Sequence, residues 1–87
     1  MANTTAIKNV IAEALPGAHI YVKDPNNDGQ HFQAIVISDS FRGKPLVLQH
    51  QMVLKPLKTA FATEVHALTL KTFTPEKWEQ EKINYIL

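Results

Sequence analysis

Two of the four histidines in the chain stand where predicted strands begin, and these positions are the best candidates for metal chemistry. His31 precedes the apolar run Phe32–Ile37. His66 precedes an alternating run in which Leu68 and Leu70 share one side. A long helical segment separates the two strands, so we expect parallel neighbours whose starts lie at the same end of a sheet. Two imidazoles at that end could reach one metal centre, and imidazole is a suitable ligand for iron.

The chain contains no cysteine, which limits the metal chemistry that it can perform alone. Iron–sulfur clusters are held mainly by cysteine thiolates, so a cluster on this chain requires a second protein that supplies them. The other two histidines are weaker candidates. His19 falls on the polar side of a predicted strand, and His50 lies among apolar helical positions, where a structural role is the simpler interpretation.

The composition indicates a small globular domain without the usual motifs of an enzyme. The chain has 87 residues, of which 45% are hydrophobic, and this predicts a single domain over 1–87. Its net charge of +1 lacks the basic excess of strong nonspecific DNA binders. No glycine-rich phosphate loop or His-Glu-x-x-His helix is present, and Ser38 and Ser40 lie in a predicted turn with no base nearby in sequence. We therefore predict no enzymatic activity and no catalytic residues.

The sequence also favours a cytoplasmic location. No apolar run approaches the roughly 20 residues that a membrane-spanning helix needs. The first residues, Met1-Ala2-Asn3-Thr4-Thr5, lack the basic and apolar regions of a signal peptide. We therefore expect neither a membrane span nor secretion.

Hydrophobic periodicity predicts the element order αββααβα. The expected elements are a helix capped within 3–5 and ended by Pro16-Gly17, strands over 18–23 and 32–37, a flexible loop over 24–29, helical turns from Leu46 to Phe61, a strand from 65 or 66, and a helix over 75–82. The second strand is apolar on both faces and is therefore placed in the middle of the sheet. Pro56 is expected to split the central helical segment in two. The tail 83–87 is expected to be frayed or loosely packed.

Three stretches of the chain resemble motifs of the BolA-like protein family. The longest, His66–Trp78, joins an alternating strand to a helix start with a threonine cap and a proline at the first helical position. The others are Asp28–Gln33, and Phe41–Leu46 running into His50–Val53. The resemblance covers nearly the whole chain, and the chain is most similar to the short acid-stress subgroup of bacterial BolA-like proteins. It implies a class II KH-like α/β sandwich, with a three-stranded mixed sheet and helices packed on one face.

The same resemblance implies a function in iron–sulfur chemistry. BolA-like proteins pair with monothiol glutaredoxins and share a [2Fe–2S] cluster, for which the partner supplies cysteine and glutathione thiolates. The family's C-terminal histidine ligand is matched here by His66. Many relatives carry a second ligand, cysteine or histidine, four residues before the strand phenylalanine; this chain has Asp28 there and His31 next to Phe32, so both stay candidates. The chain is then expected to be a non-enzymatic adaptor in iron–sulfur trafficking or in iron, redox or stress sensing.

The expected partner surface surrounds the first loop, the start of the third strand and the last helix, which is taken to lie nearby. Asp28 and Trp78 are its candidate contacts, since tryptophan is frequent at binding hot spots. Alone, the chain is expected to be a monomer or weak homodimer that holds no stable cluster.

The alternative function is that of a stress-responsive DNA-binding transcriptional regulator. The helix–turn–helix-like centre and the third strand carry cations that could meet phosphates, namely Arg42, Lys44, Lys55, Lys58 and Lys71. A KH-type RNA site needs a GXXG loop, and Arg42-Gly43-Lys44-Pro45 holds a single glycine. Scattered lysines are equally compatible with an ordinary solvated surface.

Overall fold

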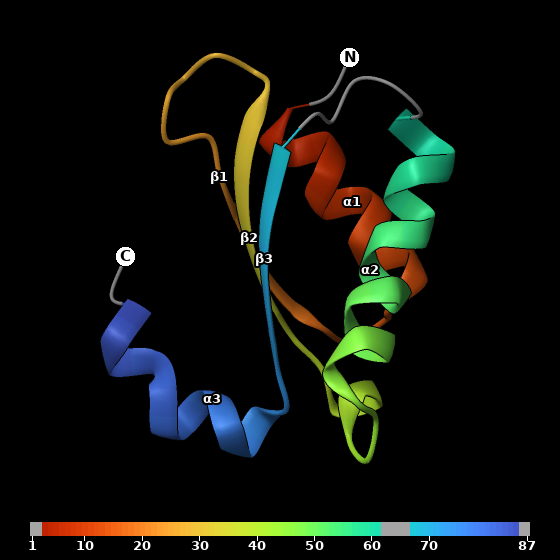
Figure 1. Ribbon diagram of the computed structural model, residues 1–87, viewed down its shortest axis with the longest axis vertical. Helices are drawn as coiled ribbons and strands as arrows, with labels where there is room; N and C mark the ends of the chain where they lie inside the picture. Colours follow the sequence, from red (N-terminus) through yellow and green to blue (C-terminus); the bar gives the residue numbers. More distant parts are fainter. Residues whose placement is uncertain (1–2, 62–66, 86–87) are drawn as a thin grey trace.

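The computed structural model describes residues 3–61 and 67–85 (Figure 1). Its elements are α1 (Thr4–Ala14), β1 (His19–Lys23), β2 (His31–Ile37), the 3-10 helix η1 (Asp39–Phe41), α2 (Leu46–Phe61), β3 (Ala67–Phe73), α3 (Pro75–Glu81) and the 3-10 helix η2 (Lys82–Tyr85). No helix in these two ranges is both long and apolar enough to cross a bilayer.

The three strands form one mixed sheet in the order β1-β2-β3. β1 and β2 are antiparallel, whereas β2 and β3 are parallel, as expected from the long helical crossover between them. β2 lies in the centre, as its two apolar faces predict. The predicted fold class, a three-stranded mixed sheet combined with helices, is confirmed.

A large core lies between one face of the sheet and the helices α1 and α2 (Figure 1). Both helices bury an apolar stripe against the sheet; the fully or nearly fully buried side chains of the core include Ile7, Ile11, Val53, Leu57, Phe32, Ala34, Val36 and Phe41. α1 begins where predicted, because the Asn3 side chain accepts a hydrogen bond from the Ala6 N–H at 2.8 Å. This core fixes the strands whose starts carry the candidate ligands.

The last helix packs on the other face of the sheet, so the expectation of helices on a single face is corrected (Figure 1). Ile35 and Ile37 of β2 form a small core there with Phe73, Trp78 and Tyr85. The Phe73 ring centroid lies 5.4 Å from that of Trp78 and 5.6 Å from that of Tyr85. The second apolar face of β2 requires this cover, and the expected fraying of the tail is wrong as far as Tyr85.

The central helical segment is one helix of 16 residues with Pro56 inside it, which corrects the expected split into two helices. Proline removes one backbone hydrogen bond and crowds the preceding turn, but it does not prevent the helix from continuing. Val53 and Leu57, on either side of Pro56, are buried against the sheet. Their burial offsets the missing hydrogen bond and holds both halves on the core as one helix.

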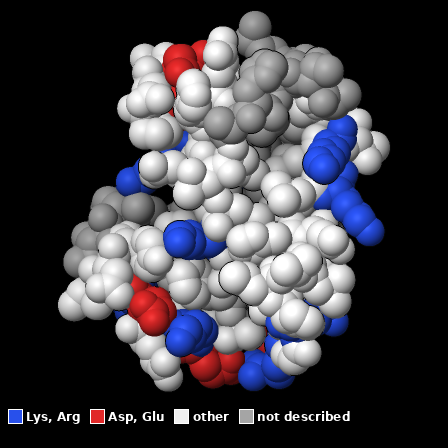
Figure 2. Space-filling model, viewed as in Figure 1, with Lys and Arg blue, Asp and Glu red and all other residues white. Residues whose placement is uncertain are grey.

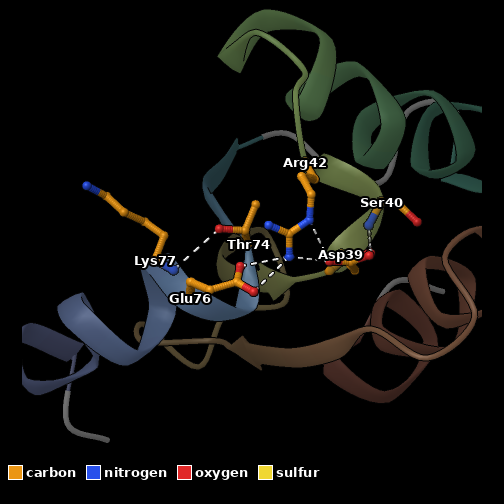
Figure 3. A network of polar contacts seen from close by, with 7 residues as sticks. Asp39, Ser40, Arg42, Thr74, Glu76 and Lys77 are labelled. Carbon is orange, nitrogen blue, oxygen red and sulfur yellow. Dashed lines mark hydrogen bonds and ion pairs between the residues drawn. The ribbon is translucent and has the colours of Figure 1, made fainter.

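An ion-pair network joins η1 to the start of α3 (Figure 3). The Arg42 guanidinium donates to both carboxylate oxygens of Glu76, at 2.8 and 2.9 Å, and its Nε donates to Asp39 Oδ1 at 3.0 Å. The hydrogen bonds from Arg42 lower the pKa of Glu76. Beside this network the Thr74 hydroxyl caps α3 by accepting from the Lys77 N–H, as predicted.

Replacing Thr72 with valine is expected to cost about 1 kcal/mol of folding free energy. Thr72 is buried, and its hydroxyl donates to Gln49 Oε1 at 2.7 Å, while Gln49 Nε2 donates to the Lys44 carbonyl at 2.8 Å. Valine keeps the shape but leaves the Gln49 amide oxygen without its donor. Urea denaturation measures the loss. Thr69→Val, at an exposed position of the same strand, should cost clearly less, and equal costs would contradict the prediction.

Candidate metal centre at the start of strands β2 and β3

His31 lies at the start of β2, and its register partner across the parallel pair is Ala67 of β3. Ala67 is the residue that follows His66 in the sequence. His66 itself lies outside the described residues, so its side chain has no described position. The register agrees with the predicted topology, in which the starts of the second and third strands lie side by side.

The loop that leads into His31 has more internal structure than the expected flexible loop. The Asp24 carboxylate accepts hydrogen bonds from the N–H groups of Asp28, at 3.2 Å, and Gly29, at 2.9 Å. Asn27 and Gly29 take left-handed conformations, with φ of 52° and 68°, which asparagine and glycine tolerate best. Sequence reasoning missed the role of Asp24; an aspartate four and five residues before the groups that it bonds was the available signal.

Asp28 organises the last turn before β2. Its Oδ1 accepts from the backbone N–H groups of Gln30, at 2.9 Å, and His31, at 3.1 Å, and its Oδ2 lies 2.9 Å from His31 Nδ1. These hydrogen bonds, that from the Gln30 N–H first, lower the pKa of Asp28 to about 2. Asp28 is therefore a carboxylate at neutral pH, and both of its oxygens already have partners within the loop.

The described residues offer this end of the sheet one exposed imidazole. The His31 side chain is 53% exposed and that of Asp28 is 36% exposed. Across residues 3–61 and 67–85, no group of three or more histidine, cysteine, aspartate or glutamate side chains gathers as a metal site would require. The described part of the chain thus presents a partial donor set, and any cluster held here needs further ligands.

The other two histidines lie away from this end. His19 is exposed at the start of β1, but β1 is antiparallel to β2, so His19 pairs with Ile37 at the far end of the sheet. His50 is half-buried in α2. His50 lines a hollow with Thr72 and Phe73 near the end of β3, so the structure groups neither histidine with His31.

Trp78 does not lie beside the first loop, and the expectation of a shared surface with the last helix is corrected. β2 spans seven residues, which is about 20 Å at 3.3 Å per residue. α3 follows the end of β3, and β3 runs parallel to β2, so α3 begins at the opposite end from His31 (Figure 1). Trp78 is half-buried there, with its ring stacked on Tyr21 at a centroid distance of 6.0 Å.

The candidate DNA-binding cations do not form one surface. Lys55 and Lys58 are exposed on α2, and Lys44 is exposed in the loop before it. Arg42 is engaged by two carboxylates. Lys71 pairs with Ile35 in the sheet and lines a groove with Tyr21 on the α3 side of the sheet. On the face of the molecule drawn in Figure 2, the lysine and arginine side chains (blue) are dispersed rather than gathered into one basic patch.

Residues 6–77, which include the whole sheet and the candidate ligands, match the family model described as BolA-like protein. The chain belongs to the BolA-like family. This BolA-like protein is 32% identical over 77 residues to the acid stress protein IbaG of Escherichia coli K12, covering 87% of this chain and 88% of that one. It is 36% identical over 55 residues to the DNA-binding transcriptional regulator BolA of the same organism, covering 63% of this chain and 52% of that one.

The solved structures agree with the family assignment. A BolA protein homologue from Coxiella burnetii superposes on this BolA-like protein with a TM-score of 0.76 at 32% identity, covering 91% of this chain and 99% of that one. A Bol-like protein from Babesia bovis gives a TM-score of 0.80 at 25% identity, covering 94% and 95%. The fold seen here is that of the BolA-like family.

Proposed function

We propose that this BolA-like protein is a non-enzymatic adaptor that binds a monothiol glutaredoxin and shares a [2Fe–2S] cluster with it. His66 and His31 are its iron ligands, and the partner supplies cysteine and glutathione thiolates. The observation that carries the proposal is the parallel register of β2 and β3, in which His31 lies opposite the residue that follows His66. In this assignment the adaptor acts in the cytoplasm, in iron–sulfur trafficking or in iron, redox or stress sensing.

The donor chemistry supports a shared cluster rather than one held by this chain alone. The chain has no cysteine, and the described residues supply one exposed imidazole at the site. Imidazole is an established ligand of [2Fe–2S] centres beside cysteine thiolates, as in Rieske centres. Two imidazoles from this chain and thiolates from a partner would complete the ligand set of the cluster.

The names of two relatives support the proposal. A relative named acid stress protein fits a function in stress sensing. The same fold is also found in the BolA domain of SufE1 from Arabidopsis thaliana, at a TM-score of 0.73 and 25% identity. A BolA domain can therefore be part of a larger protein, which suits a module that works through other proteins.

The decisive experiment mixes the protein with a cluster-loaded monothiol glutaredoxin and records visible absorption and circular dichroism. The wild-type chain should change both spectra, because imidazole replaces a ligand of the glutaredoxin cluster. His66→Ala should lose most of this change, and His31→Ala should weaken it. His19→Ala is the matched control, because His19 is an exposed strand-start histidine at the far end of the sheet. Equal spectra for wild type and His66→Ala would remove His66 from the ligand set.

The second candidate function is DNA binding, which is favoured by the relative named DNA-binding transcriptional regulator BolA. In this second candidate, Lys55 and Lys58 meet phosphates together, since both are exposed on α2 and lie three residues apart. Duplex titration at several salt concentrations tests this. Direct phosphate contact predicts a steep fall of affinity with salt, and each of Lys55→Ala and Lys58→Ala should reduce the slope by about 1. Lys71→Ala is the control, because Lys71 lies on the α3 side of the sheet; a slope unaffected by the α2 variants would reject this surface.

A further inference from the structure

The contact between Asp28 and His31 indicates which of these two side chains is available as the second iron ligand. All three hydrogen bonds that Asp28 accepts lie within 3.1 Å, and they use both of its oxygens. These bonds occupy three of the roughly four lone-pair sites of the carboxylate, and they shape the turn before β2. His31 has one ring nitrogen, Nδ1, held by Asp28, while its side chain remains 53% exposed. The loop thus leaves the His31 imidazole free to bind and engages the Asp28 carboxylate.

The chemistry of the pair determines which nitrogen carries the proton. A carboxylate can only accept hydrogen bonds, so the atom facing it, His31 Nδ1, must be the donor. In the neutral ring Nε2 then has no proton and keeps its lone pair. Histidine free in water prefers the opposite form, with the proton on Nε2. Metal-bound histidines commonly donate their other ring N–H to a carboxylate, which fixes the ring orientation and raises the basicity of the ligand nitrogen.

We infer that Asp28 is a positioning residue and not a ligand: it holds His31 with the proton on Nδ1 and presents Nε2 to the iron. This inference rests on the proposed function, because it assigns a role within the same site. It decides between the two residues that the sequence left as alternatives for the second ligand.

Asp28→Asn is the sharpest test, because it changes the atom that faces His31 and little else. The asparagine oxygen can still accept from the backbone N–H groups of Gln30 and His31. The side-chain NH2 group then faces Nδ1 and donates to it, which moves the ring proton to Nε2. Asp39→Asn is the matched control, because Asp39 follows the far end of β2 and bonds to Arg42 rather than to the loop before His31.

The tautomer is measured on the protein alone, without metal or partner, by 15N–1H correlation of the imidazole at a pH where the ring is neutral. The wild type and Asp39→Asn should carry the proton on Nδ1, and Asp28→Asn should carry it on Nε2. A wild-type ring with the proton on Nε2, or an Asp28→Asn spectrum identical to the wild type, would overturn the inference. The wild-type measurement decides this point even if the variant fails to fold.

A second measurement separates the inference from the proposed function. In the glutaredoxin mixture, Asp28→Asn should require roughly 10-fold or more protein for the same spectral change, as is typical when the support of a metal-bound histidine is lost. Full affinity in Asp28→Asn would overturn the positioning role while leaving the shared cluster intact. A wild-type chain that leaves the glutaredoxin spectrum unchanged would overturn the proposed function, and with it the role of Nε2 as a ligand.

Discussion

Replacing Phe32 with alanine should destabilise the protein by about 3–5 kcal/mol. Phe32 is 2% exposed, directly follows His31 and is among the largest fully buried side chains of the core. A chain of 87 residues has a total stability of roughly 4–13 kcal/mol at about 0.05–0.15 kcal/mol per residue. The variant would therefore lose a large share of its stability, and the start of β2 would lose the anchor that holds His31 in place.

Urea denaturation followed by far-ultraviolet circular dichroism measures this loss. Phe32→Leu, which keeps most of the volume, should cost less than about 1.5 kcal/mol and serves to test cluster sharing with the fold intact. Phe61→Ala is the matched control, because Phe61 is only half-buried at the end of α2. A loss in Phe32→Ala no larger than that in Phe61→Ala would contradict the packing described here.

Replacing Pro56 with alanine should stabilise the protein by about 2 kcal/mol. Proline in a helix interior is about 3 kcal/mol less favourable than alanine. The net stabilisation is smaller by about 0.4–1 kcal/mol, because proline also restricts the unfolded chain and alanine does not. Pro56 is the eleventh residue of α2, so alanine restores an interior backbone N–H that can bond to the Met52 carbonyl one turn before it.

The gain should appear as a higher urea midpoint with an unchanged slope. Pro45→Ala is the matched control, because Pro45 precedes α2 and no interior hydrogen bond is restored there. An unchanged or lower midpoint for Pro56→Ala would mean that contacts of the proline ring, rather than the burial of Val53 and Leu57 alone, hold the helix together.

The strands were predictable because their side chains repeat with period two and β2 is apolar on both faces. The same two-sided pattern implied that something covers Ile35 and Ile37, but the tail that does so has too few apolar residues for periodicity to identify. The error at Pro56 has a different origin. Local preference disfavours proline in a helix, whereas the buried residues around it, distant in sequence from their partners, decide the outcome.

The candidate site was predictable in its topology and not in its detail. The helical crossover places the starts of β2 and β3 together, which locates His31 from sequence alone. The contact between Asp28 and His31 depends on the course of the loop, in which the Asp24 carboxylate accepts hydrogen bonds from the backbone N–H groups of Asp28 and Gly29. The far position of Trp78 also followed from the parallel strands, since a helix after β3 begins where β2 ends.

The central strand β2 contributes residues to two cores of unequal size, and this determines which parts of the protein open first in local unfolding. α3 and η2 are attached through the small core of Ile35, Ile37 and Phe73, so they can detach briefly while β2 stays seated on α1 and α2. β2 cannot separate from α1 and α2 while α3 stays packed, because β2 contributes residues to both cores and its departure would disrupt both. Amide protons of β2 should therefore exchange with solvent most slowly, and those of the C-terminal segment soonest.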